Sequence, residues 1–374
     1  MDLRRGLKLR QKRSRILEAL PEPPTSDADW LIGLLKAAHT VGASDLDLTE
    51  TAPPVFHVDG EVVSLYDEQN PLPDWETPPL DRALEPLLPR KVLEPLLQRE
   101  RFESDLSLDV RPLGARFRIN LYYQQGRLSA VFRLIPSSPR PFKELGLDER
   151  VLEAATKARG LFLVTGTTGS GKSTTLASIV EHINRTRYVK IITIEDPVEF
   201  IYEPKRAYIV QREVGTDTKG FFDALRAALR QAPHVILLGE MRDPETIEMA
   251  LTAAETGHLV LATLHTNSAV EAVHRIVDAF PGSRQGTVRS VLASVLNAVL
   301  AQELVPRRKG EGRVLVYELL EGTQGVRNLI RQGKVEELPN LMVTEQSTNH
   351  VLRSSVVDRL VKQGEIDPSL LKTL

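Results

Sequence analysis

The sequence predicts an α/β protein in two parts, in which a small α+β domain precedes a domain built on a doubly wound, mostly parallel sheet. Three observations support this. At 374 residues the chain is longer than one hydrophobic core usually organises. The segment "IPSSPRPF" at 135–142 has the proline-rich composition of an interdomain linker. Before this segment apolar residues alternate as in half-exposed strands, whereas after it apolar strands and amphipathic helices take turns.

The first domain is predicted from alternating runs at 54–66, 104–110 and 115–135, together with two helical stretches at 28–41 and 81–99. The stretch 121–129, in which Gly126 lies between two alternating runs, is typical of a β-hairpin. The basic residues at 4–15 favour a solvated, poorly ordered arm over the alternative of an arm that contacts anionic lipid or a partner. We therefore expect a basic arm at 1–25, an α+β domain at 26–136, a proline-rich linker at 137–143 and a second domain at 144–374 with a helical C-terminal part.

The second domain is predicted from continuous apolar strands, which are typical of a sheet covered on both faces. Helical periodicity follows most of them, as in "STTLASIVEHINR". The segment "SVLASVLNAVLAQELV" at 290–305 is interrupted by polar residues, and we predict a helix of a globular protein there. The predicted strands span 161–165, 189–194, 234–238, 259–264 and 314–320.

Composition excludes several classes of protein. Because the chain has no cysteine, it holds neither a disulfide framework nor a thiolate zinc site, which fits a cytoplasmic protein without zinc. The 48 basic and 50 acidic side chains nearly balance, which argues against a nucleic-acid partner. The N-terminal "MDLRRGLKLRQKRSRIL" is basic but lacks the apolar centre of a secretion signal.

A phosphate-binding loop is predicted directly after the first strand of the second domain and directly before an amphipathic helix. Glycines let backbone N–H groups turn toward phosphates, and the N-terminus of the helix adds positive potential. Lys172 is expected to reach the β- and γ-phosphates of ATP, and the Ser173 hydroxyl is expected to bind Mg²⁺. The nucleotide-binding residues are Gly166, Thr167, Thr168, Gly169, Ser170, Gly171, Lys172, Ser173 and Thr174.

Acidic side chains follow two other strands of the predicted sheet. Glu195 and Asp196 end one strand, and Glu240 follows another. Because ligands bind outside the carboxyl ends of parallel strands, all three are expected at the edge that carries the phosphate loop. We assign Glu240 to positioning or deprotonating the attacking water, and Glu195 and Asp196 to Mg²⁺ or its waters.

Two histidines flank the strand at 259–264. A strand of this length places His258 and His265 roughly 23 Å apart at about 3.3 Å per residue, so only one of them can lie near the phosphates. If the strand runs parallel to the first, His265 is at its carboxyl end and can sense the γ-phosphate. His258 is then expected to be a packing or intersubunit residue.

Four motifs together resemble those of the secretion-type ATPases that power type IV pili and type II secretion. The segments "GTTGSGKSTT", "TIEDPVEF", "VILLGEMRDPET" and "TGHLVLATLHTNSA" are similar to the Walker A, Asp box, Walker B and His box of that family. Glu199 and His258 fall within the matched boxes. The resemblance implies a RecA-like ATPase domain behind a PAS-like N-terminal domain. The sequence departs from the family pattern at Ala232 and His234, two positions at which the family usually has acidic residues.

Within the family the chain resembles the pilus retraction ATPases most, because it has no tetracysteine module and because "GVRNLIRQGKV" at 325–335 is similar to their C-terminal signature. That resemblance implies a cytoplasmic homohexamer that acts on a pilus platform protein of the inner membrane. The hexamer is then expected to contact the membrane only through its partners. The resemblance also implies that Arg327, Asn328, Leu329, Ile330 and Arg331 couple hydrolysis to retraction. Because Arg327 and Arg331 are four residues apart, we expect them on one face of a short helix, where they offer a pair of cations to an acidic partner. Candidate arginine fingers are Arg116, Arg118, Arg133, Arg212 and Arg230.

Other functions remain possible on the residues alone. A pilus assembly or type II secretion motor is disfavoured by the missing zinc module. A weakly active accessory retraction paralogue, or a nucleotide-gated scaffold, would keep the fold with little turnover, and the intact Lys172, Ser173, Glu240 and His265 argue against the scaffold. A RecA-like nucleic-acid translocase is disfavoured by the neutral charge balance.

Overall fold

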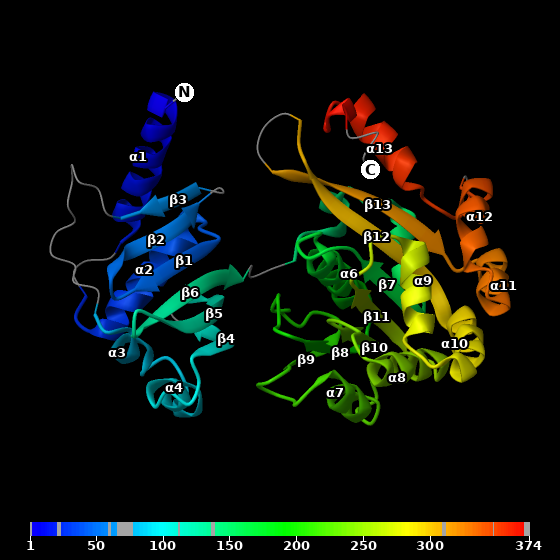
Figure 1. The fold of residues 1–374 in the computed structure, drawn as a ribbon, viewed down its shortest axis with the longest axis horizontal. Helices are drawn as coiled ribbons and strands as arrows, with labels where there is room; N and C mark the ends of the chain where they lie inside the picture. Colours follow the sequence, from blue (N-terminus) through cyan, green and yellow to red (C-terminus); the bar gives the residue numbers. More distant parts are fainter. Residues whose placement is uncertain are drawn as a thin grey trace. The chain divides into compact units, whose positions relative to one another are not determined.

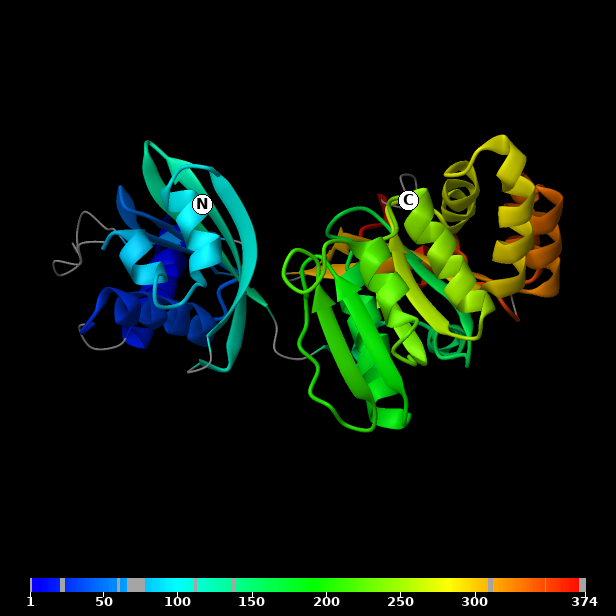
Figure 2. The same cartoon turned by 90° about the horizontal axis from the view of Figure 1, so that it is seen from below.

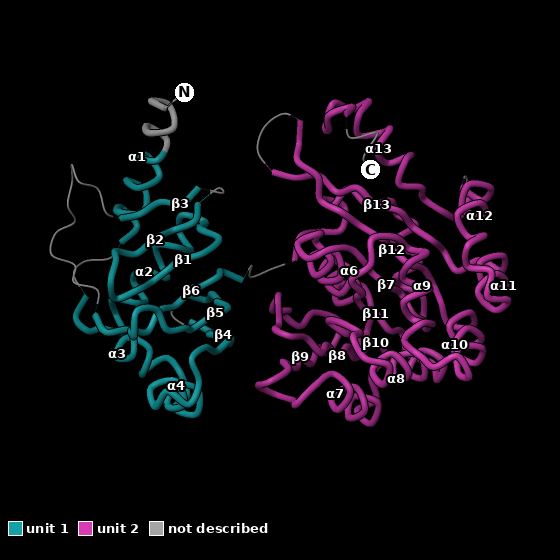
Figure 3. The backbone as a smooth tube through the Cα atoms, viewed as in Figure 1, with its two compact units in different colours: residues 1–137 teal, residues 138–374 magenta. Residues whose placement is uncertain are grey.

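In a computed structural model, the chain divides into two compact units, residues 1–137 and 138–374 (Figure 3). The structure describes residues 2–20, 24–58, 61–65, 78–110, 113–135, 139–308, 312–346 and 348–369, with side chains from residue 9 onward. Part of the expected linker at 137–143 lies outside these ranges. Its last residues begin a 3₁₀ helix, η2 (Phe142–Leu145), and Phe142 is buried in the second unit.

The first unit is an antiparallel sheet in the order β3-β2-β1-β6-β5-β4 (Figure 1). Alternation along β5 buries Phe117, Ile119 and Leu121 and leaves the intervening polar residues on the other face. The helices gather on one face of the sheet (Figure 2). The elements are α1 (Asp2–Ala19), α2 (Asp27–Val41), β1 (Asp45–Thr49), β2 (Ala52–Val58), β3 (Glu61–Ser64), α3 (Leu80–Leu84), α4 (Arg90–Leu97), β4 (Glu103–Val110), β5 (Ala115–Gln124) and β6 (Arg127–Ile135).

The basic N-terminal segment is not the solvated arm that its charges suggest. Residues 2–19 form helix α1, and Ile16 is fully buried against the first unit. Arg13 Nη2 donates to the carbonyl oxygen of Leu65 at 2.7 Å, and Lys12 pairs with Glu61 at 3.1 Å. The arm prediction was wrong because the apolar face of this helix is short, so the charges dominate its composition.

The hairpin predicted around Gly126 is confirmed, since β5 and β6 pair antiparallel up to Gln124 and Arg127. The single helical stretch expected at 81–99 is instead two helices, α3 and α4. Helix α3 ends at Leu84, and Pro89 is the N-cap residue of α4 with extended backbone.

The second unit is a seven-stranded sheet in the order β13-β12-β7-β11-β10-β8-β9. All neighbouring strands are parallel except the β12–β13 pair. The sheet elements and the helices between them are α5 (Glu149–Ala155), β7 (Gly160–Thr165), α6 (Lys172–Thr186), β8 (Lys190–Glu195), β9 (Tyr208–Glu213), α7 (Phe221–Ala228), β10 (Val235–Leu238), α8 (Pro244–Glu255), β11 (Leu259–Leu264), α9 (Ala269–Asp278), α10 (Gly282–Val295), β12 (Leu296–Pro306) and β13 (Arg313–Glu321). The C-terminal part is helical: α11 (Gln324–Gln332), η3 (Val335–Glu337), α12 (Leu338–Thr344) and α13 (Arg353–Lys362).

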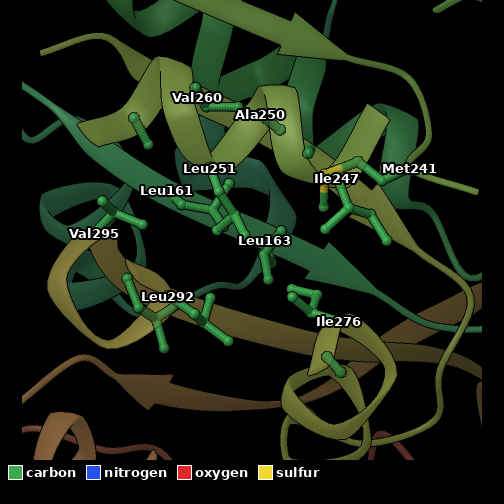
Figure 4. Close-up of a cluster of buried hydrophobic side chains, with 14 of the residues drawn as sticks. Leu161, Leu163, Met241, Ile247, Ala250, Leu251, Val260, Ile276, Leu292 and Val295 are labelled. Atoms are coloured by element: carbon green, nitrogen blue, oxygen red, sulfur yellow. The ribbon is translucent and has the colours of Figure 1, made fainter. Parts of the chain in front are cut away.

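Strand β7 is buried on both faces, as its continuous apolar sequence predicts. Leu161 and Leu163 belong to the core shown in Figure 4, which helices α8 to α10 complete. Phe162 and Val164 point into a second core with residues of α6. Because the phosphate loop follows this strand, both cores fix its starting point.

The helix predicted at 290–305 is wrong in its second half. Helix α10 ends at Val295 and the chain continues as β12, which pairs with β7 on one side and with β13 on the other. Strand β9, at the edge of the sheet, was not predicted. None of the helices that the structure describes is long and apolar enough to cross a membrane.

Candidate functional site

The loop between β7 and α6 is built on left-handed glycines. Gly169 and Gly171 have φ angles of 78° and 90°, and Gly171 is the N-cap residue of α6. Gly166 has φ 150°, and a Cβ atom there would overlap the carbonyl oxygen of Gln302 on β12. L side chains rarely adopt these conformations, so the local fold requires glycine at these positions.

Lys172 begins helix α6, and its ammonium group turns back over the loop. Its Nζ donates to the carbonyl oxygens of Gly166 at 2.7 Å and Thr167 at 3.0 Å. Burial lowers the pKa of Lys172, and the nearby Glu240 carboxylate opposes this shift. Ser173, the next residue, is exposed at the start of the helix. The loop, the ammonium and the helix N-terminus together form a site suited to an anionic phosphate group.

Glu195 is the last residue of β8 and is 7% exposed. Its Oε2 accepts a hydrogen bond from the Glu199 N–H at 3.4 Å, while its Oε1 has no hydrogen-bond partner among the described residues. Burial raises the pKa of Glu195 to about 7. Asp196, the next residue, is exposed. No group of three or more histidine or acidic side chains in the described part of the chain is arranged to hold a metal ion.

Glu240 follows β10 and meets His265, which follows β11. The distance from Glu240 Oε1 to His265 Nε2 is 3.2 Å, and Arg242 pairs with the other carboxylate oxygen at 2.8 Å. Burial raises the pKa of Glu240, but the hydrogen bond from Arg242 and the charges of His265, Arg242 and Lys172 outweigh it, so the pKa lies below its ordinary value. Glu240 is therefore a carboxylate at neutral pH.

Threonine side chains connect the strand ends that carry these groups. The Thr165 hydroxyl, at the end of β7, lies 2.7 Å from the carbonyl oxygen and 2.6 Å from the hydroxyl of Thr266, next to His265. The Thr263 hydroxyl donates to the carbonyl oxygen of Gly239, next to Glu240. These bonds link the phosphate loop strand to the segments that carry His265 and Glu240.

His258 lies at the opposite end of β11 from His265. Its Nδ1 is 2.9 Å from the carbonyl oxygen of Ala253, at the end of α8, and its own carbonyl oxygen accepts from the Gly160 N–H. The two histidines are thus separated as the strand length predicts. Ala232, where the family usually has an acid, adopts φ 49°, and His234 Nδ1 accepts from the Lys190 N–H at 3.1 Å.

The candidate arginine fingers lie in both units. In the second unit, Arg212 donates to the carbonyl oxygen of Asp217 at 3.1 Å, and Arg230 is exposed. In the first unit, Arg118 and Arg133 are direct partners across β5 and β6. Arg133 pairs with Asp45 at 2.7 Å, and Arg116 lies 3.8 Å from Asp109.

The C-terminal signature forms helix α11, and Arg327 contradicts the expected pair of outward cations. Its guanidinium donates to the carbonyl oxygens of Gly322 at 2.9 Å, Ala293 at 2.9 Å and Leu296 at 2.8 Å, and also to that of Ser294. Three of these carbonyls lie where α10 ends and β12 begins. Arg327 therefore caps a neighbouring helix.

The other coupling residues divide between packing and solvent. Ile330 is fully buried, and Leu329 packs partly buried against the same core. Asn328 and Arg331 are exposed, and Arg331 Nη1 donates to Asn328 Oδ1 at 3.1 Å. The exposed polar face of α11 therefore contains Arg331 without Arg327.

Several residues of this site were not predicted from the sequence. Arg242 lies within the predicted Walker B segment, two residues after Glu240, and this spacing could have indicated that the two side chains pair. Gln302 contacts the phosphate loop from β12, and Arg353 of α13 donates to the carbonyl oxygen of Asn267 at 2.7 Å, next to the His265 segment. No local pattern indicates these last two contacts, because they join residues far apart in the chain.

Comparisons with known proteins place this geometry in a family. The Type II/IV secretion system protein family model matches residues 104–366. The chain is 44% identical to the type IV pilus retraction ATPase PilT of Pseudomonas aeruginosa over 336 residues, 89% of this chain and 94% of that one. It is 38% identical to the type IV pilus ATPase PilU of the same organism, covering 89% and 85% of the two chains.

A solved structure supports the same assignment. The crystal structure of the pilus retraction motor PilT with bound ADP superposes with a TM-score of 0.82 at 45% identity, covering 90% of this chain and 94% of that one. The family match spans more than half of the chain and includes every strand of the second unit. The chain belongs to the type II/IV secretion system protein family.

Proposed function

We propose that this protein binds and hydrolyses ATP with Mg²⁺ and uses the energy to retract a type IV pilus, as its relatives named for that activity do. The observation that carries the proposal is the arrangement of Lys172, Glu240 and His265. The positive charge of Lys172 in the phosphate loop helps to lower the pKa of the Glu240 carboxyl group, and the Glu240 carboxylate contacts His265, which follows the neighbouring strand. Such an arrangement suits attack of water on a γ-phosphate.

The phosphates are held by the loop N–H groups, the N-terminus of α6 and Lys172. To reach a phosphate oxygen, the ammonium exchanges its present carbonyl partners, Gly166 and Thr167, for a charged acceptor. Such charge-assisted hydrogen bonds are stronger than those to neutral carbonyls. Because the site is partly buried, this attraction is less screened than it would be in water.

The residues present fit a Mg²⁺ ion bound with the nucleotide. Ser173 offers an exposed hydroxyl at the start of α6, and Glu195 offers a buried carboxyl oxygen that has no hydrogen-bond partner in the described part of the chain. Asp196 is an exposed second carboxylate beside it. When bound, Mg²⁺ neutralises charge that develops on the phosphate oxygens. Glu195 is expected to act on water near the ion, because water-mediated contacts are common for this metal.

Glu240 is proposed to orient and deprotonate the attacking water. Its carboxylate is ionised at neutral pH and is fixed from two sides by Arg242 and His265. His265 then lies where it can report whether a γ-phosphate is present. Arg242 competes for the same carboxylate, so it tunes the basicity of Glu240 as well as its position.

At the level of the assembly, we propose a cytoplasmic homohexamer that contacts the inner membrane through a pilus platform protein. The first unit is proposed to be a PAS-like domain, which supplies Arg116, Arg118 or Arg133 as candidate arginine fingers, with Arg212 and Arg230 as alternatives in the second unit. A second candidate is a weakly active accessory paralogue of the main motor, because the chain is also 38% identical to a second pilus protein, the type IV pilus ATPase PilU.

A deletion strain tests the proposal. Deleting the gene should stop twitching motility and leave more surface pili, and the wild-type gene should restore both. The Lys172→Ala gene should fail to restore them, because its product lacks the positive charge that contacts the β- and γ-phosphates of ATP. Purified wild-type protein should hydrolyse ATP, whereas folded Lys172→Ala protein should not. Fewer pili in the deletion strain would indicate an assembly motor, and unchanged motility with full ATPase activity would contradict a role in retraction.

A further inference from the structure

Strand β12 reaches beyond the end of β7 and runs under the phosphate loop. The pairing of the two strands continues to Ala301 opposite Thr165, so Gln302 is the first residue alongside the loop. Gln302 is 2% exposed. A Cβ atom at Gly166 would overlap its carbonyl oxygen, and one at Gly171 would lie 3.3 Å from its Nε2. The two outer glycines of the loop therefore pack directly on this residue.

Both ends of the Gln302 amide are used. Its Nε2 donates to the carbonyl oxygen of Ser170 at 2.8 Å, and its Oε1 accepts from the Thr175 hydroxyl at 2.9 Å. Ser170 is in the loop and Thr175 is in the first turn of α6, so one side chain spans the junction between loop and helix. Since these atoms are buried, they have little water to replace a lost partner.

The geometry of a phosphate loop explains why a donor is needed there. When backbone N–H groups turn outward to phosphates, the carbonyls of the same peptides turn inward, where each requires a hydrogen-bond donor. Lys172 serves the Gly166 and Thr167 carbonyls, and Gln302 serves Ser170. Arg313 of β13 approaches the carbonyl of Gly169 at 3.4 Å. Donors to the loop thus come from both strands of the β12–β13 hairpin.

We propose that Gln302 is a positioning residue for nucleotide binding, which holds the phosphate loop in its binding conformation through Ser170. The proposal rests on the proposed nucleotide site. Gln302 does not touch the reacting atoms, so its loss should weaken binding of ADP and ATP more than it slows the chemical step. The bond to Ser170 carries the effect, because that peptide belongs to the loop itself, whereas Thr175 lies within a helix that both its own hydrogen bonds and core packing support.

Matched variants on one strand separate positioning from stability. Asn297, at the other end of β12, is also a buried amide: its Nδ2 donates to the carbonyl oxygen of Arg159 at 3.0 Å, before β7 begins. Gln302→Ala and Asn297→Ala each remove one buried amide from β12. A second variant, Gln302→Glu, is nearly isosteric and keeps an acceptor for Thr175, but places a carboxylate oxygen against the Ser170 carbonyl.

The experiment measures ADP affinity by calorimetry, KM and kcat for ATP, and the melting temperature of the full-length protein with and without ADP. We expect both Gln302 variants to raise the ADP Kd and the KM about tenfold, the change expected for about 1.4 kcal/mol of binding energy. We expect kcat to stay within about threefold, the smaller effect expected of a residue that does not touch the reacting atoms. Asn297→Ala should lower the melting temperature but keep the wild-type Kd and the wild-type stabilisation by ADP.

Two results would overturn the proposal: an unchanged Kd in Gln302→Glu, or an equal rise of Kd in Asn297→Ala, which would show a general loss of stability. If wild-type protein itself fails to bind ADP, the nucleotide site as a whole is refuted, which is a distinct outcome. Should Gln302→Ala fail to fold, Gln302→Glu carries the test alone.

Discussion

Replacing Arg327 should cost far more stability than replacing its neighbour Arg331 on the same short helix. Arg327→Met keeps the apolar stem of the side chain and removes all of its donors. The carbonyl oxygens that lose a partner are those of Gly322, Ala293 and Leu296, together with that of Ser294. Arg331→Met is the matched control, because Arg331 is exposed and its hydrogen bond to another described residue, Asn328, stays within α11.

The magnitude follows from these contacts. A hydrogen bond from a charged donor contributes about 1.5 to 3 kcal/mol net when buried. Arg327 is half-buried, so water replaces part of the loss, and we expect Arg327→Met to reduce the free energy of unfolding by roughly 2 to 4 kcal/mol. The exposed control should change it by less than about 0.5 kcal/mol. Burial lowers the pKa of Arg327, and Arg331 adds to this, yet arginine stays charged at neutral pH.

Thermal unfolding of the full-length protein measures the difference. At roughly 2 to 4 °C per kcal/mol for a unit of this size, Arg327→Met should melt about 4 to 16 °C lower than wild type. The transition to follow is the one that ADP raises, since it belongs to the unit with the phosphate loop. The melting temperature of Arg327→Lys should fall between those of wild type and Arg327→Met, because an ammonium group keeps the charge at the α10 C-terminus but reaches fewer carbonyl oxygens. Equal melting temperatures for Arg327→Met and Arg331→Met would refute the capping role.

Two further variants test the site chemistry. Glu240→Gln should keep nucleotide binding but slow hydrolysis by about 10² or more, as expected for loss of a general base, and loss of binding with high residual turnover would instead identify a metal ligand. Burial raises the pKa of Glu195 from 4.5 to about 7, so between these pH values the folded protein holds a proton that the unfolded chain releases. The contribution of this group to the free energy of unfolding is therefore full below pH 4.5 and is lost as the pH rises through 7. Glu195→Gln should therefore gain stability relative to wild type across that window in pH-dependent urea unfolding, and a constant difference would contradict the buried carboxyl.

Much of the candidate site was predictable because its signals are local. The phosphate loop needs only the succession of strand, glycines and helix, which is contiguous in the sequence. The meeting of Glu240 with His265 follows from one further step, that parallel strands present their carboxyl ends at one edge. At that edge Glu240 Oε1 lies 3.2 Å from His265 Nε2. His258 falls at the other end by the same reasoning.

The predictions failed where long-range pairing decides the outcome. Residues 296–306 carry leucine, alanine and glutamine, which favour a helix, yet they form a strand because β7 and β13 offer hydrogen bonds on both sides. The basic segment at 4–15 similarly became a helix because Ile16 finds a core to enter. Neither partner can be identified from the residues of the segment itself.

The same limit applies to α11, and it changes what that helix can do for a motor. In sequence, Arg327 and Arg331 are four residues apart and read as one cationic face. In the fold, Arg327 is committed to carbonyls at the α10–β12 junction, which leads directly to Gln302 under the phosphate loop. A partner that binds the exposed face of α11 would contact Asn328 and Arg331. Arg327 instead connects α11 to the start of β12, the strand that contacts the phosphate loop. Contact and transmission are thus separate tasks, carried by different residues of one helix.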